Sequence, residues 1–121
     1  MHKVDILIET VEQHPELVMV RINGPLDTVA SYEFHEKMES LVKGGVYKFI
    51  VNLERLDYIS SAGIGVFPGM ALELQKNNGG IVFINVPPKI YKLFDMIGLT
   101  TIFSIKQTLE EAIKELNPHE S

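Results

Sequence analysis

Two adjacent serines, Ser60 and Ser61, are the residues of this chain best placed for chemistry. They lie in the segment 57–65, Asp-Tyr-Ile-Ser-Ser-Ala-Gly-Ile-Gly, after a short apolar run, 49–53, that is typical of a buried strand. The mostly apolar segment that follows, up to Gln75, is typical of a helix. A strand-to-helix junction concentrates unpaired backbone N–H groups and the positive end of a helix dipole. A serine there can cap the helix or carry a phosphate, and the residue types alone favour the cap.

The other residue types that serve catalysis or ligand binding show no matching pattern. The four histidines, His2, His14, His35 and His119, are scattered without metal-ligand spacing, so no metal site is predicted. A serine hydrolase needs Gly-x-Ser-x-Gly, and the segment around Ser61 lacks the first glycine. In the glycine-rich stretch 63–69, Pro68 takes the place of the third glycine of a dinucleotide fingerprint. We therefore predict no enzyme and no cofactor, with a small-molecule hydrolase kept as a minor alternative.

Composition narrows the choice of partners and compartment. The 121 residues suffice for one domain, residues 1–121, with a sizeable core. A net charge of −5 without a Lys/Arg cluster disfavours binding to nucleic acid and to anionic membranes. Cysteine is absent, which excludes disulfides and thiolate metal sites. The longest apolar run, Ala62–Leu72, is too short to span a bilayer, and the N-terminus lacks a signal-peptide layout, so we expect a cytoplasmic protein.

The hydrophobic pattern predicts an α/β domain with a mixed sheet of about five strands and about four helices. Strands are expected over 4–9, 17–22, 47–53, 81–85 and 101–103, the first two forming an antiparallel hairpin with a turn around 13–16. Helices are expected over 29–43, 61–76, 87–96 and 108–116. The tail, 116–121, is expected to fray.

Local signals refine these boundaries. Asp27 or Thr28 can cap the first helix, and Thr108 with Glu111 fits a capping box for the last one. Turn residues over 23–28 are expected to end the second strand. Pro68 cannot donate to the carbonyl of Ile64, so the second helix is predicted to kink there.

Three segments together resemble the STAS domain family and, within it, the bacterial anti-sigma-factor antagonists. The segment 51–66 resembles the family signature, in which a strand and an aromatic residue precede Asp-Ser-Ser-Gly or Asp-Ser-Ala-Gly. Gly24-Pro25-Leu26-Asp27 matches the Gly-x-Leu-Asp that precedes the first helix of the family. Residues 92–99 resemble the family segment before the last strand. The resemblance spans nearly the whole chain, and the motifs occur in the family order.

The resemblance implies roles for individual residues. The phosphorylated serine of the family falls on Ser61, and the preceding aspartate falls on Ser60, so that carboxylate is missing here. Ser60 is therefore kept as an alternative phosphorylation site. Asp27 matches a second acidic position near the phosphosite. The predicted partner-binding residues are Asp27, Ser60, Ser61, Gly63 and Ile64.

The family resemblance also implies a function, that of an antagonist in a partner-switching pathway. The unphosphorylated chain is expected to bind an anti-sigma factor that is also a serine kinase with a histidine-kinase-like ATP fold. Phosphorylation of Ser61 is expected to release the chain, and a PP2C-type phosphatase to restore it. The alternative is a STAS scaffold or ligand-sensing module that is not phosphorylated.

Overall fold

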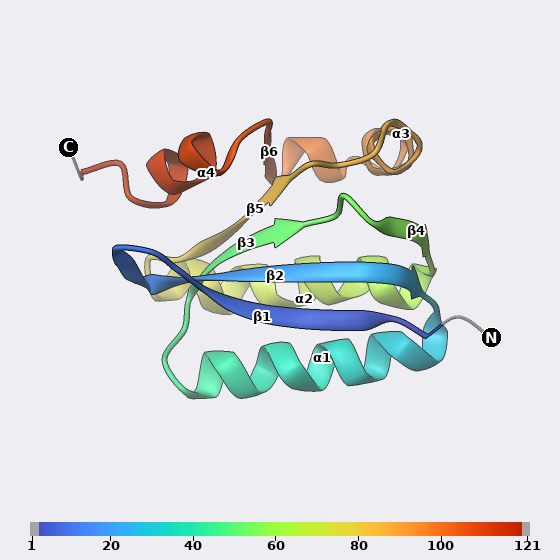
Figure 1. Cartoon of the computed structure of the whole chain (residues 1–121), viewed down its shortest axis with the longest axis horizontal. Coiled ribbons are helices and arrows are strands. Elements are labelled where there is room, and N and C mark those ends of the chain that lie inside the picture. Colours follow the sequence, from blue (N-terminus) through green and yellow to red (C-terminus); the bar gives the residue numbers. More distant parts are fainter. Residues whose placement is uncertain (1–2, 120–121) are drawn as a thin grey trace.

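The computed structural model describes residues 3–119, which form one mixed sheet with helices on both faces (Figure 1). The sheet has six strands, one more than predicted: β1 Asp5–Val11, β2 His14–Leu26, β3 Lys48–Asn52, β4 Leu56–Ile59, β5 Gly80–Ile84 and β6 Ser104–Lys106. The helices are α1 Thr28–Lys43, α2 Ser61–Lys76, α3 Pro88–Met96 and α4 Leu109–Leu116, with a 3₁₀ turn, η1, at Leu99–Thr101. The predicted α/β class and the four helices are confirmed.

The strand order is β1-β2-β3-β5-β6, with β4 paired to the far end of β2. β1 and β2 form the predicted antiparallel hairpin, and every other pairing is parallel. The hairpin turn lies at Glu12 and Gln13, slightly earlier than predicted, with Gln13 in the left-handed region at φ 69°. Crossover helices link the parallel strands, as this topology requires.

Alternating residues of the central strands belong to two hydrophobic cores on opposite faces of the sheet. In β3, Phe49 and Val51 belong to the larger core, whereas Ile50 belongs to the smaller one. α1, α2 and α3 contribute to the larger core, in which the Phe67 ring lies 4.9 Å from that of Phe83. α4 covers the smaller core on the other face (Figure 1). The apolar run of β3 is therefore explained by burial on both faces.

The second strand is much longer than the predicted 17–22, and the turn expected over 23–28 does not end it. β2 continues to Leu26 because its last residues pair with β4, a strand that we did not predict. The register shifts between Gly24 and Pro25, and Gly24 adopts φ 98°, which glycine tolerates best. β4 shows no clear strand pattern in the sequence, because it has only four residues and its middle two are exposed.

The predicted fifth strand, 101–103, is wrong. Gly98 ends α3 in the left-handed conformation at φ 86°, and the next residues form η1. The hydroxyl of Thr101 donates to the carbonyl of Gly98 at 2.7 Å, and that of Thr100 donates to Asp95 Oδ1 at 2.8 Å. Such local side-chain bonds offer the backbone an alternative to sheet pairing, so the strand starts only at Ser104.

The prediction that the tail frays from residue 116 is also wrong for its first two residues, Leu116 and Asn117. Leu116 is the buried last residue of α4, and Asn117 is only 7% exposed. The Asn117 amide donates to Glu16 Oε2 and accepts from Lys48 Nζ, both at 2.7 Å. These bonds tie the end of α4 to β2 and β3. Residues 120 and 121 lie outside the described residues.

Two local predictions concern helix ends and helix shape. The capping box of Thr108 and Glu111 is confirmed at the start of α4. α2 runs without a break through Pro68, which is exposed, so no interruption occurs there. The bend of α2 at Pro68 stays a prediction.

Candidate functional site

The ends of two parallel strands bring the predicted site residues together. Leu26 of β2 pairs with Ile59 of β4, so the next residues, Asp27 and Ser60, follow neighbouring strands at the same level. Asp27 is the N-cap of α1 and Ser60 is the N-cap of α2. Both helices therefore begin at one end of the molecule, as Figure 1 shows, and direct the positive ends of their dipoles toward it.

Ser60 has a structural role at this end. Its side chain is buried, with the residue 6% exposed, and its Oγ accepts a hydrogen bond from the Gly63 N–H at 3.1 Å. Its own backbone N–H donates to the Leu26 carbonyl at 2.9 Å. The hydroxyl thus satisfies a buried donor of the first turn, which is the work of an N-cap residue.

Ser61 is the opposite case. It is the first residue of α2 and is exposed. Within the described part of the chain, no hydrogen bond engages its hydroxyl. The structure therefore places Ser61 at a helix start on the surface, as predicted, with a hydroxyl that an approaching enzyme can reach.

Gly63 and Ile64 lie one turn further along α2. Gly63 is buried, and a Cβ there would lie 3.0 Å from Leu26 Cδ2 and 3.1 Å from Ile59 Cγ1. The glycine thus lets α2 pack closely on the ends of β2 and β4. Ile64 is half-buried, and its backbone N–H donates to the carbonyl of Ser60 at 2.9 Å. Partner binding by these two residues stays a prediction.

The surface near Ser61 carries apolar side chains and one capping carboxylate. Val29 is 78% exposed and Tyr58 is 54% exposed. Asp27 is exposed, and its Oδ1 accepts from the Ala30 N–H at 2.8 Å. The first turns of both helices contain no acidic residue. Such a surface suits binding to a protein partner, and the helix end can accommodate an added anionic group.

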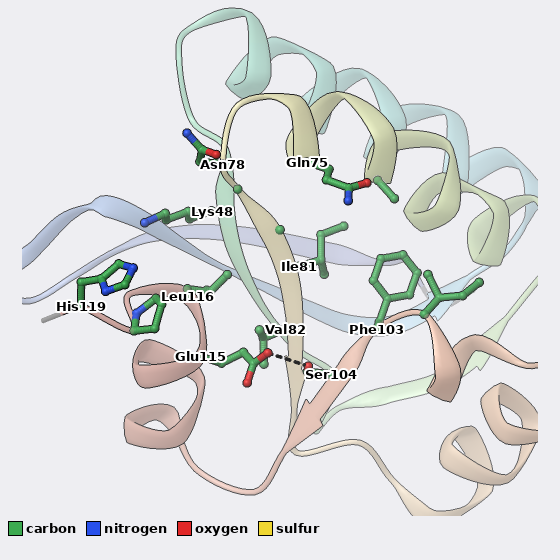
Figure 2. Close-up of a pocket in the computed structure, with 15 residues that line it drawn as sticks. Lys48, Gln75, Asn78, Ile81, Val82, Phe103, Ser104, Glu115, Leu116 and His119 are labelled. Carbon is green, nitrogen blue, oxygen red and sulfur yellow. Dashed lines mark hydrogen bonds between the residues drawn. The ribbon is translucent and has the colours of Figure 1, made fainter.

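A cavity with a volume of about 870 Å³ lies elsewhere on the molecule (Figure 2). Gln75 of α2 lines it, 14 residues beyond Ser61 and so roughly 20 Å along the helix axis. Its charged side chains already have partners: Lys48 bonds Asn117 at 2.7 Å, and Glu115 bonds Ser104 at 3.1 Å. This cavity therefore adds nothing to the chemistry around Ser61.

Among residues 3–119, one carboxyl group has a perturbed pKa. The pKa of Glu16 is lowered, first by a hydrogen bond from its own backbone, with smaller contributions from Asn117, His14 and Lys48. Burial acts in the opposite direction and is outweighed. The cluster of Glu16, Asn117 and Lys48 was not predicted, because its members are far apart in the sequence. It anchors α4 and is remote from the serines.

Other kinds of site find no support in the described part of the chain. Among residues 3–119, no three His, Cys, Asp or Glu side chains are grouped so as to hold a metal ion. None of the helices described is long and apolar enough to cross a membrane.

Known proteins are similar to this chain in sequence. The family model of the STAS domain matches residues 10–112. An anti-sigma-B factor antagonist of Staphylococcus epidermidis is 29% identical over 103 residues, which cover 85% of this chain and 94% of that protein.

Solved structures are similar over nearly the whole chain. The anti-sigma factor antagonist SpoIIAA in its unphosphorylated form is 26% identical, with a TM-score of 0.73 over 96% of this chain and all of the other. The Bacillus cell fate determinant SpoIIAA in the phosphorylated form is 31% identical, with a TM-score of 0.70 over 93% of this chain and 99% of the other.

Proposed function

The chain belongs to the STAS domain family, and we propose that it is an anti-sigma factor antagonist switched by phosphorylation of Ser61. The observation that carries the proposal is the difference in burial and hydrogen bonding between the two serines. Ser60 is buried as the N-cap, whereas Ser61 is exposed and its hydroxyl is not engaged within the described residues. The names of similar proteins support the antagonist role, and one of them was solved in a phosphorylated form.

In its unphosphorylated form, the chain binds an anti-sigma factor through the surface around Ser61. The contact includes Asp27, Ser61 and Ile64, with Ser60 and Gly63 shaping it from beneath. The partner is a serine kinase with a histidine-kinase-like ATP fold, and its capture frees the factor that it inhibits. The setting is the cytoplasm.

Phosphorylation reverses the interaction through local electrostatics. A phosphate adds about −1.5 to −2 charges at neutral pH. The start of α2 tolerates this charge without unfolding, because the helix N-terminus favours anions. The capping carboxylate of Asp27 lies at the neighbouring helix start, so the added charge joins an existing negative group. The phosphorylated surface can no longer be desolvated against the partner at low cost, and a PP2C-type phosphatase restores binding.

The decisive experiment incubates the chain with an anti-sigma factor of the serine-kinase type and ATP, then locates phosphate by fragment mass spectrometry. The parent and Ser60→Ala should both carry phosphate on Ser61, and Ser61→Ala should carry none. Phosphate on Ser60 would refute the assignment of the two serines. Stable binding without any phosphate transfer would favour the scaffold alternative.

A charge mimic tests the release step. Ser61→Asp should fold like the parent, because a carboxylate at a helix N-terminus contributes about 0.3–1 kcal/mol of stability. It should bind the kinase partner more weakly than the parent does, by about 2 kcal/mol or more, since the charge must be desolvated in the contact. Ser61→Ala is the matched control and should bind like the parent. Isothermal titration calorimetry measures the affinity of each variant for the kinase loaded with a non-hydrolysable ATP analogue. Equal affinities of Ser61→Asp and Ser61→Ala would contradict the switch.

A further inference from the structure

The outer edge of β1 is open. β1 is the last strand of the sheet and pairs only with β2 among the described residues. An open edge presents unpaired N–H and C=O groups that can pair with a further strand. Two large apolar side chains of this strand are partly exposed, Leu7 at 45% and Ile8 at 41%. The seven-residue strand is therefore able to accept a partner strand along its length.

The charges along this edge favour one arrangement of two copies over the two neighbouring ones. In a symmetric antiparallel pair, one residue lies opposite itself on the two-fold axis. With Ile6 on the axis, Lys3 of each copy lies opposite Glu9 of the other, and Val4 lies opposite Ile8. This register therefore forms two attractive charge pairs, Lys3 with Glu9, and three apolar pairs, Val4 with Ile8 twice and Ile6 with itself. Asp5 lies opposite Leu7, so its carboxylate faces no like charge.

The two neighbouring symmetric registers are unfavourable. With Asp5 on the axis, the two Asp5 carboxylates face each other. With Leu7 on the axis, Asp5 faces Glu9 at both ends of the pair. Like charges directly opposite one another destabilise strand pairing, so the edge discriminates against both shifted arrangements.

We propose that a second copy of this chain pairs with β1 in the register centred on Ile6, which joins the two sheets into one. The Glu9 carboxylate is held in place by Arg21 of β2, whose Nε donates to its Oε1 at 2.7 Å. Lys3 of the other copy completes a three-charge network there. Lys3 is exposed and precedes β1, where it is free to reach across.

The dimer is weak and depends on concentration. Two strands of seven residues bury less than the roughly 1,200 Å² at which stable protein–protein interfaces begin. Self-association should therefore appear between about 10 μM and about 1 mM, the affinity range of small interfaces. The proposal does not depend on the role of Ser61.

Sedimentation velocity over this concentration range tests the proposal. The parent should sediment faster as its concentration rises. Lys3→Glu and Glu9→Lys should each self-associate about tenfold more weakly or worse, because each places two like-charge pairs in the interface. A parent that stays monomeric to about 1 mM, or variants that associate like the parent, would overturn the proposal.

Mixing the two variants gives the sharpest result. A Lys3→Glu chain beside a Glu9→Lys chain restores opposite charges at both ends, so the mixture should associate like the parent. The net charges of −7 and −3, obtained from −5 by replacing one charge with its opposite, are both negative and cannot cause attraction by themselves. The absence of association in the mixture would overturn the register.

Matched controls come from an exposed part of α1. Lys37→Glu and Glu36→Lys change the net charge by the same amounts, and both residues are exposed. These variants should self-associate like the parent, alone and mixed. Glu9→Lys also removes the ion pair with Arg21, so its folding is checked by thermal unfolding. If it does not fold, the comparison of Lys3→Glu with Lys37→Glu decides, and equal association of these two would overturn the proposal.

Discussion

Replacing each of the two adjacent serines by alanine should have very different effects on stability. Ser60→Ala removes the Oγ that accepts from the Gly63 N–H at 3.1 Å. The loss of an N-cap costs about 0.5–2 kcal/mol. The hydrogen bond is buried, so water does not replace the lost acceptor easily, and we expect the upper half of that range.

Ser61→Ala should be almost neutral. Ser61 is the first helical residue, is exposed, and its hydroxyl makes no hydrogen bond within the described residues. Surface substitutions of this kind usually change the free energy of unfolding by less than about 0.5 kcal/mol.

Thermal unfolding followed by circular dichroism measures the difference. For a domain of 121 residues, a loss of about 1 kcal/mol lowers Tm by roughly 3–6 °C. Ser60→Ala should show at least this shift, and Ser61→Ala should melt with the parent. If Ser61→Ala were the less stable protein, the cap would be Ser61 and our assignment of the two roles would be wrong.

Two further predictions concern α2 and the anchor of α4. Pro68→Ala should leave the free energy of unfolding unchanged or raise it by about 1 kcal/mol in urea titrations, because alanine supplies the missing N–H for the Ile64 carbonyl while loosening the unfolded chain; a clear loss would show that the proline shape is needed. The pKa of Glu16 is lowered in the folded state, so its contribution to stability is present above the ordinary carboxyl pKa and is lost as pH falls through the folded value. Asn117→Ala should therefore be less stable than the parent at neutral pH, with the difference shrinking in acid, and a difference that did not change with pH would disprove the link.

The junction between β4 and α2 shows which features can be predicted from neighbouring residues and which cannot. Two neighbouring serines after a buried strand predict a cap and an exposed hydroxyl. Which of the two serines caps the helix and which is exposed depends on where β4 ends, since one step in register exchanges a buried residue for an exposed one. β4 itself is defined by its pairing with β2, which no short-range pattern encodes.

The sequence by itself determined the features that depend on neighbours along the chain. These are the four helices, the capping box at Thr108, the apolar central strands and the motif around Ser61. Tertiary structure alone decided the features that need a partner distant in sequence: the extension of β2, the burial of Asn117 and the side-by-side starts of α1 and α2. The physical reason is that helix periodicity and capping act over about four residues, whereas strand pairing and burial are set by residues brought together only when the chain folds.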